Sequence, residues 1–230
     1  MNRHVPAARA QPFARAALLA FVICVASWRS AESASAQPDA MRVRSLLELR
    51  DDRLVRQHWD LSCGAAVVAT LLTYQLGSPV SERDAALGML RSGDARLVRA
   101  RLGFSLLDVK RFAASRGFDA AGYGDLTLDE LVAMAPVIAP TRVFGFGHFV
   151  VVRGRQGGRL LLADPAFGNR TISVGAFQAA WPSRIGLVIL PKGQPHPPNR
   201  MGAPPELFLV PASAALRSAE ADLRAAGSVR

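Results

Sequence analysis

The sequence predicts an α+β protein in which N-terminal helices pack on a C-terminal antiparallel sheet. The first observation is an apolar run without proline or glycine, Ala65–Leu76, which indicates a buried helix. The second is a set of three helix-start motifs of the form Ser/Thr-x-x-Asp/Glu further along the chain. The third is a change after Gly145, where β-branched segments separated by turn residues indicate strands. Helices followed by strands favour α+β over an alternating order.

The composition is that of one globular domain with short appendages. The chain has 230 residues, of which 50% are hydrophobic and 20% are charged, and this balance excludes a wholly disordered protein. Two cysteines, Cys24 and Cys63, are too few for a disulfide scaffold. Only one stretch is long and apolar, which excludes a polytopic membrane protein. The arginines are scattered rather than clustered, so we expect no nucleic-acid binding.

Residues 1–36 predict a secretory signal peptide. Basic residues precede an apolar run, Ala16–Trp28, and Ala34-Ser35-Ala36 fits the small-x-small cleavage rule. The run is shorter than the roughly 20 residues of a membrane span, and an uncleaved anchor is the alternative. Cleavage removes four arginines and one glutamate, and so lowers the formal net charge from +10 to +7. The mature protein is then periplasmic and keeps one cysteine, Cys63, which must be buried or used.

The helices are predicted from capping signals. Asp60 or Ser62 is expected to cap the helix Ala65–Leu76, and Gly77 follows its end. The three motifs that predict further helix starts are Ser81-x-x-Asp84, Ser105-x-x-Asp108 and Thr127-x-x-Glu130.

The strands are predicted from β-branched runs and turns. Residues 147–153 form one strand, Gln156-Gly157-Gly158 is the hairpin turn, and residues 159–164 form the return strand. Further short elements are expected: strands at 119–123, 137–139, 170–174 and 185–190, and a helix at 176–181.

The expected domain spans residues 49–191. A lead-in at 37–48 precedes it, and residues 192–230 follow as a proline-rich linker and a helical tail. The amphipathic stretch 212–225 predicts the helix of that tail, with a solvated or frayed end as the alternative.

Cys63 lies at the predicted start of the first long helix, directly before Gly64. Free backbone N–H groups and the partial positive charge of a helix N-terminus stabilise a thiolate, which is the nucleophilic form of cysteine. Cys63 is therefore a candidate nucleophile. A small buried apolar residue is the alternative interpretation.

His148 and Asp164 are candidate partners for such a thiolate. His148 begins its strand after Gly145-x-Gly147, where small residues leave room for a substrate backbone. Asp164 ends the return strand, so the hairpin pairing brings the two side chains close together. A carboxylate there can hold the imidazole in one tautomer and stabilise its cation. A structural histidine and an ordinary Asp-Pro turn are the alternatives.

Gln57 lies six residues before Cys63. Its side-chain amide can donate to an oxyanion together with the backbone N–H of the nucleophile, although a surface glutamine is the simpler interpretation of Gln57 alone. One cysteine and three dispersed histidines in the mature chain show no metal-ligand spacing, so we expect no metal and no other cofactor.

Four segments in this order and spacing resemble the C39 family of cysteine peptidases. They are Gln57-x5-Cys63-Gly64, Gly103-Phe104-Ser105-Leu106-Leu107-Asp108, Gly147-His148-Phe149-Val150-Val151 and Leu162-Ala163-Asp164-Pro165. The similarity extends from about Val55 to Leu190. Domains of that family process double-glycine leader peptides, usually at the N-terminus of bacterial peptide-exporting ABC transporters.

The resemblance implies a papain-like fold with Cys63 as nucleophile and His148 as base. It also implies that Asp164 orients the imidazole and that Gln57 donates to the oxyanion. There are two departures from the family: Ser62 stands where Asp is common, and Ala65-Ala66-Val67 stands where Pro or another Cys is frequent. Neither departure removes a group of the triad, but both bear on leader-peptide specificity.

We therefore expect a free-standing, exported cysteine endopeptidase without a membrane span once its signal peptide is removed. By its resemblance, its partner is a peptide or protein: a glycine-rich secreted or surface-fibre protein, a functional amyloid, or a protein with a Gly-Gly leader. Two alternatives use the same residues. One is a non-catalytic peptide-binding module of a secretion system, and the other is an amidase or acyltransferase with a Cys/His/Asp triad.

Overall fold

Six strands form one antiparallel sheet in residues 44–202, the part of the chain that the computed structural model describes. Their order across the sheet is β1-β6-β2-β3-β4-β5. The strands are β1 (Phe118–Tyr123), β2 (Val137–Val143), β3 (Phe146–Gln156), β4 (Arg159–Asp164), β5 (Gly168–Ser173) and β6 (Gly186–Pro191). β2 meets β6 through one residue pair but pairs with β3 along its whole length. Strands β2–β5 are therefore the continuous part of the sheet.

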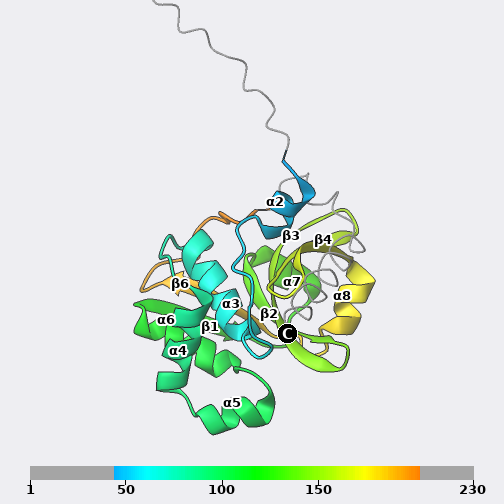
Figure 1. Cartoon of the computed structure of the whole chain (residues 1–230). Coiled ribbons are helices and arrows are strands. Elements are labelled where there is room, and N and C mark those ends of the chain that lie inside the picture. The colour runs from blue at the N-terminus through cyan, green and yellow to red at the C-terminus, as the bar shows by residue number, and fades with distance from the viewer. Residues whose placement is uncertain (1–43, 203–230) are drawn as a thin grey trace, which may run out of the picture. The chain divides into compact units, whose positions relative to one another are not determined.

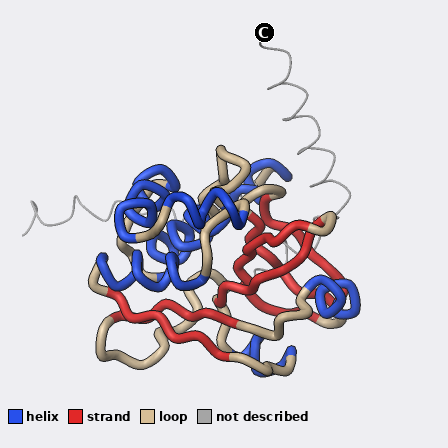
Figure 2. Tube along the Cα trace, turned by 90° about the horizontal axis from the view of Figure 1, so that it is seen from below, coloured by secondary structure: helices blue, strands red, loops and turns tan. Residues whose placement is uncertain are grey.

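Helices pack against this sheet from different sides. They are α2 (Leu46–Asp51), α3 (Cys63–Thr70), the π-helical turn η1 (Leu71–Gln75), α4 (Glu82–Ser92), α5 (Ala95–Arg101), α6 (Leu106–Ser115), α7 (Leu128–Ala133) and α8 (Val174–Ala180). Figure 1 shows α3, α4 and α6 grouped together, with α3 toward β3, and α8 on the far side of β3 and β4. In Figure 2 the same main group of helices lies on one side of the strands, with α8 apart from it.

The apolar core has two parts, one on each side of the central strands. Val151 belongs to the part formed with α3, α4 and α6, whereas its neighbours Val150 and Val152 belong to the part formed with α7 and α8. Successive side chains of a strand point to opposite faces, so β3 is covered on both. This explains why its central residues, 149–152, are continuously apolar rather than alternating.

Helix α3 is the buried central helix that its sequence predicts. All eight of its residues are buried, and the chain continues through η1 until Gly77 takes a positive φ of 69°. Gly64 is required near the helix start, because a Cβ there would lie 3.0 Å from the Cβ of Phe104. The predicted helix over 65–76 is confirmed, with its start at Cys63.

The predicted capping signals are also confirmed. Ser105 and Thr127 form complete capping boxes, and the Ser81 side chain accepts a hydrogen bond from the backbone N–H of Asp84. The β3–β4 hairpin turns at Gly157 and Gly158, as predicted, between the paired residues Gln156 and Arg159. The predicted strands and the helix near 176–181 all occur, with bounds that differ by a few residues.

The start of α3 differs from the expectation in one respect. Ser62 is the N-cap residue, but its side chain makes no capping hydrogen bond. Its hydroxyl lies 2.6 Å from the carbonyl oxygen of Trp59 and also bonds the carboxylate of Glu82. The side chain of Ser62 therefore holds the loop before Cys63 in place and does not cap α3.

Two helices lie where the sequence analysis places none. α2 begins inside the expected lead-in with a capping box formed by Ser45 and Glu48. α5 begins after Asp94, whose side chain accepts from the backbone N–H of Arg96 at 2.8 Å. The same capping rule that predicts three other helices applies to α2, and the N-cap preference of aspartate applies to α5.

The chain stays packed beyond Pro191, the expected end of the domain. Gln75 donates to the carbonyl of Pro198 at 2.9 Å and accepts from the backbone N–H of Arg200 at 2.8 Å, and Met201 is fully buried. The described part of the expected linker, up to residue 202, thus lies against η1 and β3.

Two predicted segments lie outside the described residues: the signal peptide at 1–36 and the helical tail with its stretch at 212–225. Within residues 44–202, none of the helices has the length and apolar character needed to cross a bilayer.

Candidate active site

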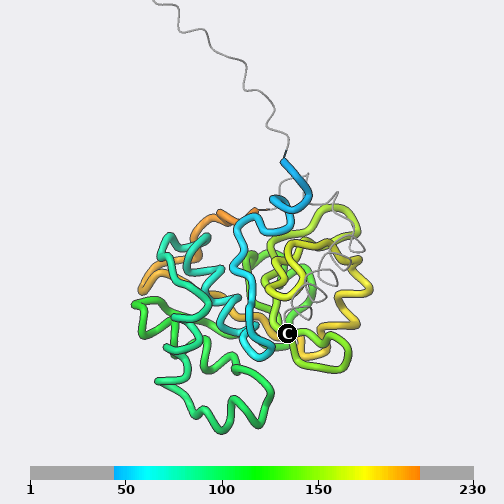
Figure 3. The backbone as a smooth tube through the Cα atoms, viewed as in Figure 1, coloured from blue at the N-terminus to red at the C-terminus, as the bar shows by residue number. Residues whose placement is uncertain are grey.

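The loop before α3 delivers Cys63 to the start of β3, beside His148. Figure 3 shows this segment, residues 52–62, running between the helices and the strands to the start of α3. Arg56 fixes it by donating to the carbonyls of Pro165 and Ala166 at 3.1 and 2.7 Å. The backbone N–H of Gln57 donates to Pro165 as well, at 3.0 Å. The segment that carries the cysteine is thereby tied to the turn that follows Asp164.

Cys63 is the first residue of α3, and it is a free thiol that is 8% exposed. It lies beside the imidazole of His148, whose pKa it helps to raise. The thiol therefore combines a helix N-terminus with a cationic partner, two features that stabilise a thiolate.

His148 is held between a carboxylate and the cysteine. Its Nε2 lies 2.8 Å from Oδ1 of Asp164, and its side chain is 11% exposed. Burial disfavours the imidazolium, but the charges of Asp164 and Cys63 and their hydrogen bonds outweigh burial and raise the pKa of His148 from 6.5 to about 10. The histidine is thus cationic at neutral pH.

Asp164 is a fully buried carboxylate with four donors. Oδ1 accepts from His148 and from the backbone N–H groups of Ala166 and Phe167 at 3.0 and 3.3 Å, and Oδ2 accepts from Nε of Arg170 at 2.9 Å. Burial raises the pKa of Asp164, but His148 and Arg170 outweigh burial and lower it from 3.8 to about 2. The Asp-Pro turn and the histidine partner are therefore both present, and neither interpretation excludes the other.

Gln57 lies beside this cluster. Its backbone is bonded to Pro165, and its Nε2 donates to the carbonyl of Trp59 at 3.3 Å. An amide nitrogen carries two hydrogens, and this bond uses one of them. The side-chain oxygen is buried and has no hydrogen-bond partner. The structure thus places Asp164, through a hydrogen bond, and Cys63 beside the same imidazole of His148, and it fixes Gln57 to the turn after Asp164.

Two further residues of the site escape the sequence analysis. Arg170, on β5, bonds Asp164 and lies over the ring of Phe167, 5.7 Å from its centroid. Glu82, on α4, is 3% exposed and bonds both His58 and Ser62 in the loop before the cysteine. A buried carboxylate one residue after the N-cap Ser81 carries no sequence signal of its own. Arg170, by contrast, could have been found from the sequence, because pairing of the two predicted strands that became β4 and β5 brings it near Asp164.

A cavity of about 480 Å³ opens beside His148. Its lining residues are Asp60, Leu61, Arg101, Leu102, Val143, Gly145, Phe146, Gly147, His148, Ala166 and Phe167. An apolar groove of about 410 Å³ shares Leu61 with this cavity and is lined by α4, α5 and Phe104, with Arg83 and Arg99 at its wall. The two hollows meet at the loop before Cys63, so a chain that passes His148 can reach both.

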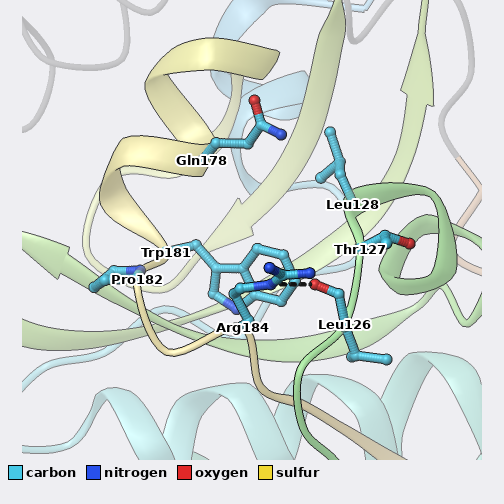
Figure 4. A pocket seen from close by; sticks show the side chains of 7 residues that line it. All are labelled: Leu126, Thr127, Leu128, Gln178, Trp181, Pro182 and Arg184. Atoms are coloured by element: carbon cyan, nitrogen blue, oxygen red, sulfur yellow. Dashed lines mark hydrogen bonds between the residues drawn. The ribbon is translucent and has the colours of Figure 1, made fainter.

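A third pocket, of about 320 Å³, lies between α7 and α8 and contains none of the candidate residues. Figure 4 shows the guanidinium of Arg184 in it, bonded to the carbonyl of Leu126 at 2.8 Å. Among the described residues, no group of three or more His, Cys, Asp or Glu side chains is placed to hold a metal ion.

The row of thiol, imidazole and carboxylate can perform acyl transfer. A thiolate beside an imidazolium attacks carbonyl carbon, the imidazolium protonates the leaving group, and a buried carboxylate keeps the ring oriented. A helix N-terminus and a nearby amide can stabilise the oxyanion that forms.

Comparison with known proteins places this geometry among peptidases. The sequence model of the peptidase C39 family matches residues 51–194. Two relatives bear the name probable functional amyloid protease FapD. One, from Pseudomonas aeruginosa, is 36% identical over 166 residues, which are 72% of this chain and 72% of the relative. The other, from Pseudomonas fluorescens, is 37% identical over an alignment of 175 residues, and the match covers 73% of this chain and 76% of the relative.

A solved structure shares the fold. It is a double glycine motif protease from an AMS/PCAT transporter in complex with the leader peptide, and it is 28% identical with a TM-score of 0.51. The match covers 60% of this chain and 91% of that one. The predicted α+β, papain-like architecture is thereby confirmed.

Proposed function

Because this chain belongs to the peptidase C39 family and is a cysteine peptidase, we propose that Cys63 is its nucleophile and His148 its general base. In this proposal Asp164 orients the imidazole, and the amide of Gln57 donates to the oxyanion together with the N–H of Cys63. The observation that carries the assignment is the 2.8 Å contact between His148 and Asp164, with Cys63 on the same imidazole.

The reaction is hydrolysis of a peptide bond in two acyl-transfer steps. The Cys63 thiolate attacks the carbonyl carbon, and the electron pair of the carbonyl π bond moves to its oxygen. When that pair returns, the C–N bond breaks and His148 gives its proton to the leaving amine. Water then attacks the thioester while His148 takes its proton. The carboxylate product leaves, and the thiolate and imidazolium are restored.

The two hollows support a peptide substrate that extends along the site. The cavity beside His148 is lined partly by glycines, and a glycine-rich segment fits it because it brings little side-chain volume. The groove at α4 and α5 is mostly apolar and suits two or three apolar side chains on the same chain. We propose a glycine-rich secreted or surface-fibre partner, supported by the amyloid-protease name of the relatives and the leader peptide bound to the solved neighbour.

Export through residues 1–36 is part of the proposal, and it rests on the basic leader, the apolar run and the Ala34-Ser35-Ala36 motif. N-terminal sequencing of the protein recovered from the periplasm should begin near Gln37. Recovery of periplasmic protein that still begins at Met1 would contradict cleavage.

Peptide cleavage is tested with a synthetic peptide that carries apolar residues followed by a Gly-Gly pair. Mass spectrometry should show cleavage by the wild-type protein and none by Cys63→Ala, which leaves α3 intact because alanine is a good helix former. A peptide with Val-Val in place of Gly-Gly is the matched substrate control. Cleavage of both peptides at the same rate would contradict the glycine preference, and undiminished cleavage by Cys63→Ala would contradict the nucleophile.

A further inference from the structure

The loop that carries the proposed oxyanion donors is held by a carboxylate from another helix. Glu82, in the first turn of α4, accepts from the backbone N–H of His58 at 2.8 Å, from Nδ1 of His58 at 2.7 Å, and from the hydroxyl of Ser62. It is 3% exposed. Three donors satisfy the charge despite its burial, and they join both ends of the segment 58–62 to α4.

The same network continues to Gln57. The carbonyl oxygen of Trp59 accepts from the backbone N–H of Ser62 at 3.2 Å and from Nε2 of Gln57 at 3.3 Å. The hydroxyl of Ser62 lies 2.6 Å from that oxygen and carries one hydrogen, which faces both Trp59 and Glu82. That hydrogen can be donated to only one of the two oxygens. When it is donated to Glu82, the backbone N–H of Ser62 still donates to Trp59, so Glu82 is linked to the amide of Gln57 through Ser62 and Trp59.

Ser62 also connects this network of hydrogen bonds to Cys63. Ser62 directly precedes Cys63 and is the N-cap residue of α3. Its backbone thus sets the direction of the Cys63 N–H, which is the other proposed oxyanion donor. A displacement of Ser62 would change the directions of the Gln57 amide and the Cys63 N–H together, whereas the side chains of Cys63 and His148 are held by α3 and β3.

We propose that Glu82 is a positioning residue for the oxyanion site. It acts through Ser62 and the carbonyl of Trp59, and it holds the amide of Gln57 and the N–H of Cys63 in the directions that the transition state requires. Donors that are fixed beforehand stabilise an oxyanion without reorganisation, so this anchoring contributes to rate and not to substrate binding. The inference rests on the proposed roles of Gln57 and Cys63.

A purely structural role of Glu82 would have a different signature. A carboxylate that only ties α4 to a loop would change the stability of the fold and would affect every reaction of Cys63 alike. A positioning role affects only those reactions of Cys63 that form an oxyanion.

Two small reagents separate these possibilities in the full-length protein carrying Cys24→Ala, in which Cys63 is the one remaining cysteine. p-Nitrophenyl acetate acylates a thiolate: sulfur attacks the carbonyl, an oxyanion forms, and p-nitrophenolate leaves with the electron pair of the broken C–O bond. Iodoacetamide alkylates the same thiolate by displacing iodide, and no oxyanion forms. The quantity to measure is the ratio of the two rate constants at Cys63, followed by nitrophenolate release and by mass spectrometry.

Glu82→Gln should lower the acylation-to-alkylation ratio at least about tenfold, toward the roughly 10²–10³-fold loss expected for removing a donor in Gln57→Ala. Ser81→Ala is the matched control, because it removes the N-cap of the same helix without touching residues 57–62. It should lower the midpoint of thermal unfolding and leave the ratio within about twofold of wild type.

The inference is overturned if Glu82→Gln leaves the ratio unchanged or lowers both rates equally. If Glu82→Gln fails to fold, the same ratio is measured for Ser62→Ala. This variant removes the hydrogen bond between Ser62 and Glu82, while Glu82 keeps its bonds to His58. A ratio equal to that of wild type in Ser62→Ala then overturns the inference. A wild-type Cys63 that reacts with neither reagent in the folded protein contradicts the proposed function itself, and the inference with it.

Discussion

Two buried polar clusters share the strands β3 and β5, and they differ in what they face. The first, the catalytic cluster, joins His148, Asp164 and Arg170 and adjoins the cavity beside His148. The second, the clasp, surrounds Arg153, which is fully buried. Buried charged side chains at one end of β3 thus belong to the proposed catalytic site, whereas those at the other end hold distant segments of the fold together.

The clasp joins segments that are distant in the sequence. Arg153 donates to the carbonyls of Met201 and Asp52 at 2.7 and 3.0 Å and to Oδ1 of Asn169 at 2.8 Å. Asn169 in turn donates to the carbonyls of Leu49 and Asp52. Burial lowers the pKa of Arg153 to about 10, partly offset by Asp52, so the guanidinium stays charged. The segments on both sides of the domain are thereby fixed to β3.

The two clusters differ in whether the buried charged group contacts a reacting group. In the catalytic cluster one member, His148, keeps 11% of its side chain exposed and touches a nucleophile. In the clasp the charge is enclosed on all sides and bonds mainly to backbone carbonyls. We therefore expect changes in the first cluster to affect turnover, and changes in the second to affect stability.

The largest effect is expected from Asp164→Asn. The amide leaves the shape of the cluster nearly unchanged but removes the charge that holds His148 protonated, so turnover of the peptide substrate should fall by roughly 10²–10⁴-fold. Peptide binding, measured by isothermal titration calorimetry in a Cys63→Ala background, should change little. Loss of binding equal to the loss of turnover would instead indicate a collapse of the site.

Arg153→Met breaks the clasp and should destabilise the fold by roughly 3–5 kcal/mol, since the buried acceptors lose their donor. Urea unfolding measures this loss. The fraction that stays folded should alkylate Cys63 at the wild-type rate, because the catalytic cluster does not depend on Arg153. A lower alkylation rate in protein that is fully folded would contradict the separation of the two clusters.

Arg170→Met should reduce turnover about tenfold, because Asp164 loses one donor and one favourable charge. The pKa of Asp164 should rise from about 2 toward its ordinary value, which carboxyl ¹³C chemical shifts can follow during an acid titration. Arg170→Lys keeps the charge and should show a smaller rise. An unchanged titration of Asp164 in Arg170→Met would contradict the role of the guanidinium.

The smallest effect is a pH dependence of stability. The pKa of Asp164 is lowered, so its contribution is full above pH 3.8 and is lost as the pH falls to about 2. The pKa of His148 is raised, so its contribution is full below pH 6.5 and is lost as the pH rises to about 10. The stability difference between wild type and Asp164→Asn, on the order of 2 kcal/mol, should therefore be largest between pH 4 and 6.5. Thermal unfolding across this range tests it, and a difference that grows above pH 8 would contradict it.

His148 and Asp164 of the catalytic cluster could be predicted from the sequence because they are local, whereas Arg170 is missed although it lies one turn further along the chain. A hairpin with a Gly-Gly turn brings the strand of His148 beside the strand that ends at Asp164, and a single turn leads from there to Arg170. The apolar run marks the helix of Cys63. Strand pairing and helix caps follow from neighbouring residues, so this part of the fold is visible in the sequence.

The clasp and the Glu82 network could not be predicted in the same way. Arg153 meets Asp52 and Met201, which lie 101 and 48 residues away, and Glu82 meets residues 20 and 24 positions earlier. Such partners are set by how whole elements pack, and no periodicity or motif marks them. Ser62 shows the same limit, because its position predicts a cap while its actual bonds depend on α4.

The central claim is that a thiolate at Cys63 is maintained by the imidazolium of His148. The most direct measurement is the rate of Cys63 alkylation by iodoacetamide in the folded protein at pH 6, for wild type and for His148→Ala. The account predicts that wild type reacts at least about tenfold faster, and that the two rates converge above about pH 10, where His148 loses its proton. Equal rates at pH 6, or labelling of Cys63 only after denaturation, would contradict it.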